Sequence, residues 1–228
     1  MKYILSLFVA LFSAGAFGQQ ITYQQFIADA KTDMNLQPEY GGMPKTKEMK
    51  TADNAFIALA LKADTTPQNA SQHLIRLGFS YLYSGDFETA MKRFNQAWLL
   101  NPKNENAFWG YGAVYGSFND YAAANSQLDK GLAINPNSSV ILTDKATLFF
   151  VQFQQDQDQS KLNTALGLLN KSYAIDATNV STAYKLSICY FLDKDCINAW
   201  KFYDACQKLG GQPIAENYTD ALKKACPR

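Results

Sequence analysis

Histidine is almost absent from this 228-residue sequence, in which His73 is the only example. A Ser-His-Asp or Cys-His catalytic set would have to be built around that one side chain, and the nucleophile elbow G-x-S-x-G does not occur. The phosphate-binding patterns G-x-x-x-x-G-K-S/T and G-x-G-x-x-G are also missing. The sequence therefore predicts a protein that is not an enzyme and that binds no cofactor.

Long hydrophobic runs are missing except at the start of the chain. Lys2 is followed by an apolar run from Tyr3 to Phe12 and by the small residues Ala16 and Gly18. This pattern is typical of a cleaved signal peptide over residues 1–18, and the run is too short to span a membrane. We expect a periplasmic or secreted protein whose mature chain has no transmembrane segment; a buried N-terminal helix is the alternative.

An excess of one charge is lacking as well. The chain has 21 Lys and Arg against 20 Asp and Glu, and loss of Lys2 with the signal peptide would leave 20 of each. Such a balance favours neither nucleic acid nor an anionic membrane as partner.

Cysteine is confined to the last forty residues, as Cys189, Cys196, Cys206 and Cys226. The spacings C-x6-C and C-x9-C match no zinc finger or ribbon, and no histidine lies nearby, so we expect no metal site. In an exported chain, clustered cysteines indicate disulfide chemistry, although buried free thiols remain an alternative for Cys189 and Cys206.

One apolar template is written twice between Ser71 and Ser138, at a spacing of about 34 residues. The landmarks of the first copy are Leu74, Leu77, Gly78, Tyr81, Ala90, Phe94, Ala97 and Pro102. Those of the second copy are Phe108, Tyr111, Gly112, Tyr115, Ala124, Leu128, Gly131 and Pro136. Apolar residues three and four apart form one stripe on each of two helices, and small residues allow the helices to cross closely. We expect Gly78 to cross against Ala90 and Gly112 against Ala124.

These landmarks resemble the tetratricopeptide repeat (TPR) pattern L-G-x2-Y, A-x3-F and P, and the chain is similar to exported bacterial members of that family. The resemblance implies an all-α, right-handed α-solenoid of helix pairs. Gly85–Asp86 and Asn119–Asp120 supply the turn and the N-cap between the helices of a pair. We expect repeats at 71–104, 105–138, 139–179 and 180–212, followed by a capping helix at 213–228. The longer third repeat has its extra residues in Gln152–Lys161, expected as a lengthened helix end plus a solvated loop.

Residues 19–70 are expected to form an N-terminal helical extension. Helices are predicted at Ile21–Asp33 and Met49–Ala63, with a Gly/Pro-rich loop over Asn35–Thr46. The extension either caps the solenoid, or its loop, with Tyr40 and Met43, folds across the groove or contacts a partner.

Repeat geometry favours one disulfide pairing. Cys196 would open the second helix of the fourth repeat, and Cys226 would end the antiparallel capping helix beside it. Cys206 lies about fifteen ångströms further along its helix, at about 1.5 Å per residue. We therefore expect Cys196 to pair with Cys226, with Cys189 to Cys196 as the alternative.

In TPR proteins the first helix of each repeat lines a concave groove, and counting from the landmarks identifies its residues. They are Ile75, Phe79, Leu82, Tyr83, Asn106, Trp109, Ala113, Thr143, Thr147, Phe150, Tyr184, Ile188 and Phe191. Most are apolar or aromatic, unlike the Lys, Asn and Arg of a carboxylate clamp. The resemblance therefore implies a scaffold that binds a protein or peptide in an aromatic groove. The alternative is a carbohydrate or peptidoglycan binder in which Trp109, Tyr83 and Tyr184 stack on sugar rings. If all the groove residues were instead buried as core, neither kind of binding site would exist.

Overall fold

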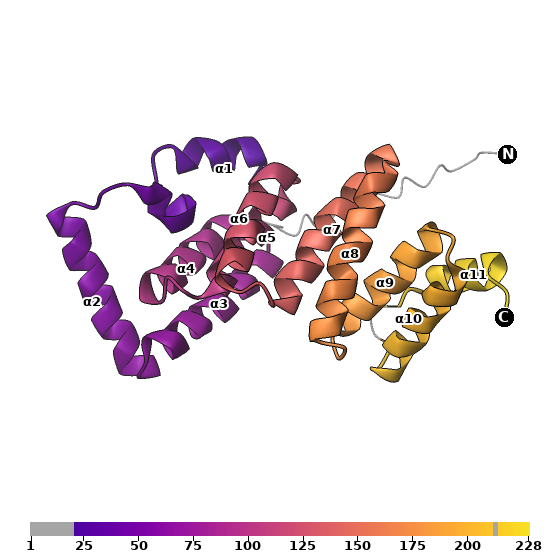
Figure 1. The fold of residues 1–228 in the computed structure, drawn as a ribbon. Coiled ribbons are helices and arrows are strands. Elements are labelled where there is room, and N and C mark those ends of the chain that lie inside the picture. The colour runs from indigo at the N-terminus through magenta and orange to yellow at the C-terminus, as the bar shows by residue number, and fades with distance from the viewer. Residues whose placement is uncertain (1–20, 212–213) are drawn as a thin grey trace, which may run out of the picture.

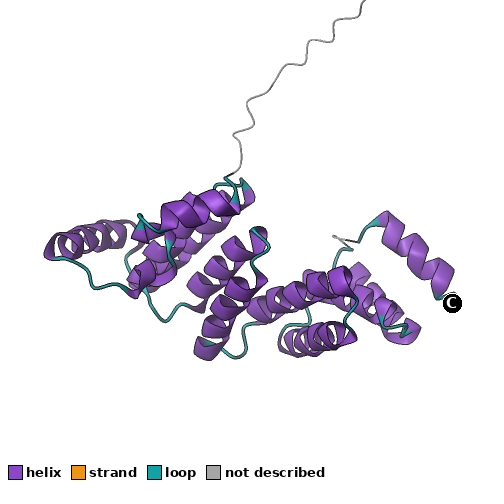
Figure 2. Ribbon diagram, turned by 90° about the horizontal axis from the view of Figure 1, so that it is seen from above, coloured by secondary structure: helices purple, strands orange, loops and turns teal. Residues whose placement is uncertain are grey.

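The computed structural model describes residues 21–211 and 214–228, and within these ranges the chain forms eleven α-helices, two short 3-10 helices and no strand (Figure 1). Figure 2 shows the same arrangement from above, with short loops joining successive helices. The expectation of an all-α fold is confirmed. The expected signal peptide lies outside the described residues. No helix within the described ranges is both long and apolar enough to cross a membrane.

Four antiparallel helix pairs stack side by side along the molecule (Figure 1). The first pair is α3 (Pro67–Tyr83) with α4 (Phe87–Leu100), and the second is α5 (Glu105–Ser117) with α6 (Tyr121–Ile134). The third is α7 (Ser139–Asp156) with α8 (Gln159–Ile175), and the fourth is α9 (Val180–Leu192) with α10 (Cys196–Lys208). The fold is therefore an α-solenoid.

The turns inside the four pairs share one construction. Each places a residue in the left-handed region directly before an aspartate that caps the next helix through its side chain. The left-handed residues are Gly85 (φ 82°), Asn119 (φ 61°), Gln157 (φ 58°) and Lys194 (φ 64°). The capping residues are Asp86, Asp120, Asp158 and Asp195. A short polar side chain at the N-cap accepts hydrogen bonds from backbone N–H groups that have no partner inside the helix. The turn chemistry expected at the first two pairs is confirmed.

In the third repeat, the lengthened helix end expected within Gln152–Lys161 is confirmed, but the solvated loop expected beside it is only a two-residue turn. Helix α7 continues to Asp156 and α8 begins at Gln159, so only Gln157 and Asp158 separate them. The extra residues lengthen both helices. An ion pair between Lys161 and Asp156 spans the turn, and glutamine, which dominates the exposed end of α7, is a good helix former.

Close helix crossings depend on glycine. A Cβ atom added to Gly78 would lie 2.4 Å from the Phe94 ring, and one added to Gly110 would lie 2.3 Å from the same ring. The fully buried Phe94 side chain is thus held between two helices that lack side chains at the contact. The nearest neighbour of Gly78 is Phe94 rather than Ala90, whereas Gly112 lies against Leu128 and the Ala124 carbonyl as expected.

The N-terminal extension consists of α1 (Tyr23–Ala30), two 3-10 helices (Met34–Leu36 and Pro38–Gly42) and α2 (Lys47–Asp64). Helix α1 packs on the end of α5, where Phe26 contacts Phe118 and Tyr115. The 3-10 helices pack on α4, and α2 contacts α3 without burying any of its own residues.

Buried Asn95 of α4 holds the 3-10 segment in place. Its amide donates to the carbonyl groups of Asn35 and Gln37, each at 2.8 Å. Its oxygen accepts from the Tyr111 hydroxyl at 2.7 Å and from the backbone N–H of Tyr40 at 3.4 Å. This segment contains two consecutive non-glycine residues in the left-handed region, Glu39 and Tyr40, both at φ 56°. Such a conformation costs free energy and persists only where the surroundings enforce it. The 3-10 segment therefore lies on α4, the second helix of the first pair, whereas α1 and α2 contact the first helices α5 and α3.

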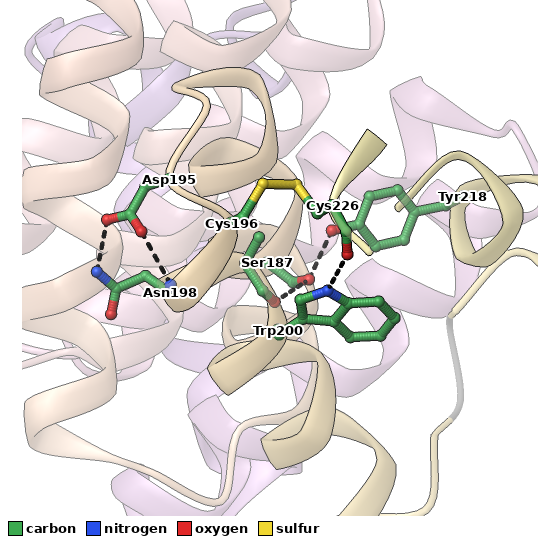
Figure 3. The surroundings of a disulfide bond; sticks show 8 residues. Ser187, Asp195, Cys196, Asn198, Trp200, Tyr218 and Cys226 are labelled. Atoms are coloured by element: carbon green, nitrogen blue, oxygen red, sulfur yellow. Dashed lines mark hydrogen bonds between the residues drawn. A yellow bond between two sulfur atoms is a disulfide. The ribbon is translucent and has the colours of Figure 1, made fainter. Parts of the chain in front are cut away.

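Helix α11 (Glu216–Ala225) closes the other end of the solenoid. A disulfide joins Cys196 of α10 to Cys226 directly after α11 (Figure 3). This is the pairing favoured from repeat geometry, and Cys189 and Cys206 are buried free thiols. The indole N–H of Trp200 donates to the Cys226 carbonyl at 2.7 Å. Leu222 is fully buried against α10, so α11 covers the last apolar face, as the end of a solenoid requires.

Candidate functional site

A hollow lies on the first helices of repeats one to three. It is an open pocket of about 400 Å³ between α3, α5 and α7, extended by the turn into α6. Its lining residues are Phe79, Leu82, Tyr83, Gly112, Ala113, Gly116, Ser117, Asn119, Tyr121, Leu128, Asp144, Thr147, Leu148 and Val151. We call this the groove pocket.

Small residues on α5 create the hollow. Gly112, Ala113 and Gly116 form its floor, where larger side chains would fill the space between α3 and α7. A Cβ atom added to Gly116 would meet only Leu148, at an ordinary contact distance of 3.6 Å. The pocket is thus empty because α5 carries glycine there, and a single larger side chain could fill it.

Aromatic rings form one wall of the pocket. Phe79 packs on Trp109 with 4.2 Å between ring centroids and on Tyr83 with 6.0 Å. Tyr83 is 80% exposed, which is unusual for a large aromatic side chain and leaves its ring available to a partner. Burial of part of the ring, together with the nearby Asp144 carboxylate, raises the pKa of Tyr83, so its hydroxyl is protonated at neutral pH.

Asp144 is the one charged residue among those that line the groove pocket. Its Oδ2 accepts a hydrogen bond from the indole N–H of Trp109 at 2.6 Å. Its Oδ1 lies 4.0 Å from the Lys185 ammonium of α9, the outer limit for an ion pair. Lys145, the next residue along the chain, is paired with Asp129 instead. The Trp109 hydrogen bond therefore fixes the orientation of the Asp144 carboxylate, and Lys185 neutralises its negative charge only in part.

A smaller apolar notch continues the groove toward the fourth repeat. It has a volume of about 20 Å³ and shares Thr147 with the groove pocket. Phe150, Lys185, Ile188 and the buried thiol of Cys189 also line it. Burial raises the pKa of Cys189 to about 12, so this thiol is not a reactive nucleophile at neutral pH.

The expected groove residues fall into three groups. The first group contributes to one of the two hollows. The groove pocket is lined by Phe79, Leu82, Tyr83, Ala113 and Thr147, and its wall is supported by Trp109. The notch is lined by Phe150 and Ile188. A second group was wrongly expected in the groove: Ile75 and Thr143 are only 2% and 3% exposed and belong to the core. Thr143 is hydrogen-bonded there to Ser172 and Thr182. Half-buried Asn106 lines neither hollow.

The third group, Tyr184 and Phe191 of the fourth repeat, is covered by α11. Both rings pack edge-on against Tyr218, at 5.8 Å between centroids. Tyr218 is also hydrogen-bonded to Ser187 at 2.6 Å (Figure 3). Burial raises the pKa of Tyr218 to about 12. The open groove therefore ends at the notch, because the disulfide-linked helix covers two of the three groove positions of the last repeat and leaves only Ile188 in the notch.

Sequence reasoning did not place nine of the fourteen lining residues in the groove, among them Gly116, Tyr121 and Asp144. Counting from the TPR landmarks selects large side chains on the first helices and passes over a glycine that leaves space. Tyr121 opens a second helix, where no groove residue is counted. The run of glycines at 110, 112 and 116 in one helix was the signal that could have located the hollow.

Catalytic groups are not assembled in the described part of the chain. His73 lies 3.0 Å from Asp64, and no serine or cysteine there is hydrogen-bonded to it. Among the same residues, no group of three or more His, Cys, Asp or Glu side chains could hold a metal ion.

The stacked helix pairs, their turn chemistry and the groove on the first helices define a tetratricopeptide-type solenoid. The solved structure of TTC0263, a thermophilic TPR protein of Thermus thermophilus, is similar over 68% of this chain and 80% of its own, with a TM-score of 0.56 and 17% identity. MamA from Desulfovibrio magneticus RS-1 has a TM-score of 0.48 and 16% identity over 72% of this chain and 97% of its own. YrrB, a TPR protein with an unusual peptide-binding site, has a TM-score of 0.47 and 16% identity over 90% of this chain and 100% of its own. No protein-family model and no curated protein sequence matches the chain.

Proposed function

We propose that this chain is an exported, non-enzymatic adaptor that binds an extended peptide, or an extended segment of a protein, across the first helices of repeats one to three. The observation that carries the proposal is the groove pocket, an apolar and aromatic hollow that is open among the described residues 21–211 and 214–228. In this proposal residues 71–228 form the binding unit, and the described part of the N-terminal extension, residues 21–70, supports its first two repeats.

The size and walls of the groove favour an extended segment. A pocket of about 400 Å³ accepts a few side chains rather than a folded domain. Exposed Tyr83 and half-buried Phe79 offer the rigid aromatic surface that dominates binding energy in many interfaces. The adjoining notch would take one small apolar side chain from the same segment.

Export is supported by two independent features. The apolar run of Tyr3–Phe12 is typical of a signal peptide. The disulfide between Cys196 and Cys226 persists in oxidising compartments, such as the periplasm or the extracellular space.

A sugar-binding role is not favoured by the geometry. Stacking on sugar rings needs flat faces exposed together, yet Trp109 is covered by Phe79 and Tyr184 by Tyr218. Of the three rings that such a site would use, Tyr83 alone is largely exposed. One exposed ring provides no stacking platform.

Filling the pocket tests the proposal. Gly116→Leu adds a side chain to the pocket floor without a clash at Cβ, and it improves helix propensity. Gly167→Leu is the matched control, because Gly167 is also helical, is exposed and has open space around it, outside both hollows. With the full chain immobilised, we expect peptides from a random ten-residue library to bind the wild type and the control but not Gly116→Leu, while all three melt within a few degrees. Equal peptide binding by Gly116→Leu and the control would contradict the proposal.

A further inference from the structure

The groove pocket carries a single fixed negative charge. Thirteen of its fourteen lining residues are uncharged, and the remaining one is Asp144. The hydrogen bond from the Trp109 indole orients this carboxylate, and about two fifths of the side chain stays exposed. A carboxylate placed in an apolar hollow attracts a cation more strongly than one on an open surface, because the surroundings screen it less.

The nearby cations leave this charge available. Lys145, the next residue in the chain, is held by Asp129. Lys185 of α9 reaches Asp144 only at 4.0 Å, from the side of the notch. A partner's ammonium or guanidinium group could approach Oδ1 from the open pocket at hydrogen-bond distance.

The walls also suit a basic side chain. Lysine and arginine have long apolar stems, which Leu148 and Val151 can contact while the charged head reaches the carboxylate. The faces of Tyr83 and Tyr121 border the same space and attract cations through their ring quadrupoles. An acidic segment would meet repulsion from Asp144 and would find no cation among the lining residues.

We infer that the occupant of the groove is an apolar peptide segment that places one lysine or arginine side chain at Asp144. The inference rests on the proposed function and names the chemistry of the partner that the groove selects.

The test uses full-length protein and a ten-residue peptide library randomised among Leu, Phe, Ala, Ser, Lys and Glu. The readout is the Lys-to-Glu ratio of the peptides retained. Asp144→Asn removes the charge and keeps an oxygen that can accept from Trp109. Asp220→Asn is the matched control, since it changes the net charge equally but is exposed on α11, outside the pocket. Lys185→Met removes the competing cation and keeps an apolar stem.

We expect wild type and Asp220→Asn to enrich lysine, and Asp144→Asn to reduce the Lys-to-Glu ratio by about two- to fivefold, the range for an exposed ion pair. Lys185→Met should raise the ratio. Retained peptides without lysine enrichment, or equal enrichment by Asp144→Asn and Asp220→Asn, would overturn this inference and leave the groove as a peptide site. No retention by wild type beyond that of Gly116→Leu would overturn both this inference and the proposed function.

Discussion

Replacement of Asn95 by alanine should detach the N-terminal extension from the solenoid. The variant removes both donors that hold the Asn35 and Gln37 carbonyl groups and the acceptor of the buried Tyr111 hydroxyl. Each buried polar group left without a partner costs about 1 to 3 kcal/mol, although water entering the gap restores part of that. Because the three losses share one cavity and do not add fully, we expect a total loss of about 2 to 4 kcal/mol.

Urea unfolding followed by circular dichroism measures this loss. At a slope of about 2 kcal/mol per molar urea, the midpoint should fall by about 1 to 2 M. Asn54→Ala is the control, because Asn54 is exposed on α2, and its midpoint should stay near that of wild type. Hydrogen exchange should show lost protection in residues 23–42 before any in α7–α10, since solenoid repeats interact mainly with their neighbours. A loss below about 0.5 kcal/mol would refute the role given to Asn95.

Two further predictions concern the end cap and the helix crossings. Replacement of Cys196 and Cys226 by serine removes a crosslink across a sequence separation of 30, and the chain-entropy treatment gives a loss of unfolding free energy of about 3 to 4 kcal/mol. In hydrogen exchange, α11 should lose amide protection while α3–α6 keep theirs. Unchanged protection of α11 would contradict its dependence on the disulfide. Gly110→Ala places a Cβ atom against the buried Phe94 ring and should lower the unfolding free energy by about 1 to 3 kcal/mol. The control Gly167→Ala should be neutral or stabilising. A Gly110→Ala variant that unfolds at the wild-type urea concentration would show that the two helices do not cross closely.

The solenoid could be predicted from the sequence because the features that specify it are local. Turn residues such as Asn119 and Asp120, and apolar residues at helical spacing, act within one repeat and recur about 34 residues later. The disulfide followed from the same regularity, since helix order places Cys196 beside Cys226. Within Gln152–Lys161 the lengthened helix end was predicted correctly. The solvated loop beside it was wrong, because polar composition was taken as a sign of loop, whereas an exposed polar stretch can also extend a helix.

The limits of the groove could not be predicted, because they depend on contacts between segments far apart in the sequence. Tyr184 stands at a groove position in the repeat pattern, and only the path of α11 shows that Tyr218 covers it. From the sequence, Asn95 is expected to be an exposed polar residue on the surface of a helix. Only the structure shows that the 3-10 segment packs on it. The hollow itself arises from a missing side chain at Gly116, which a search for large binding residues does not detect.

Photo-crosslinking in the source organism is the measurement that most directly tests binding in the groove. A photoreactive p-benzoylphenylalanine is introduced at Tyr83, which lines the groove pocket, and separately at Ile197, which lies at the start of α10 outside it. The two positions are almost equally exposed, at 80% and 83%, so random encounters should label them alike. Binding in the groove predicts a defined protein adduct at position 83 that is missing at position 197 and is lost when Gly116→Leu is added. The same adducts at both positions, or an adduct at 83 that survives Gly116→Leu, would contradict it.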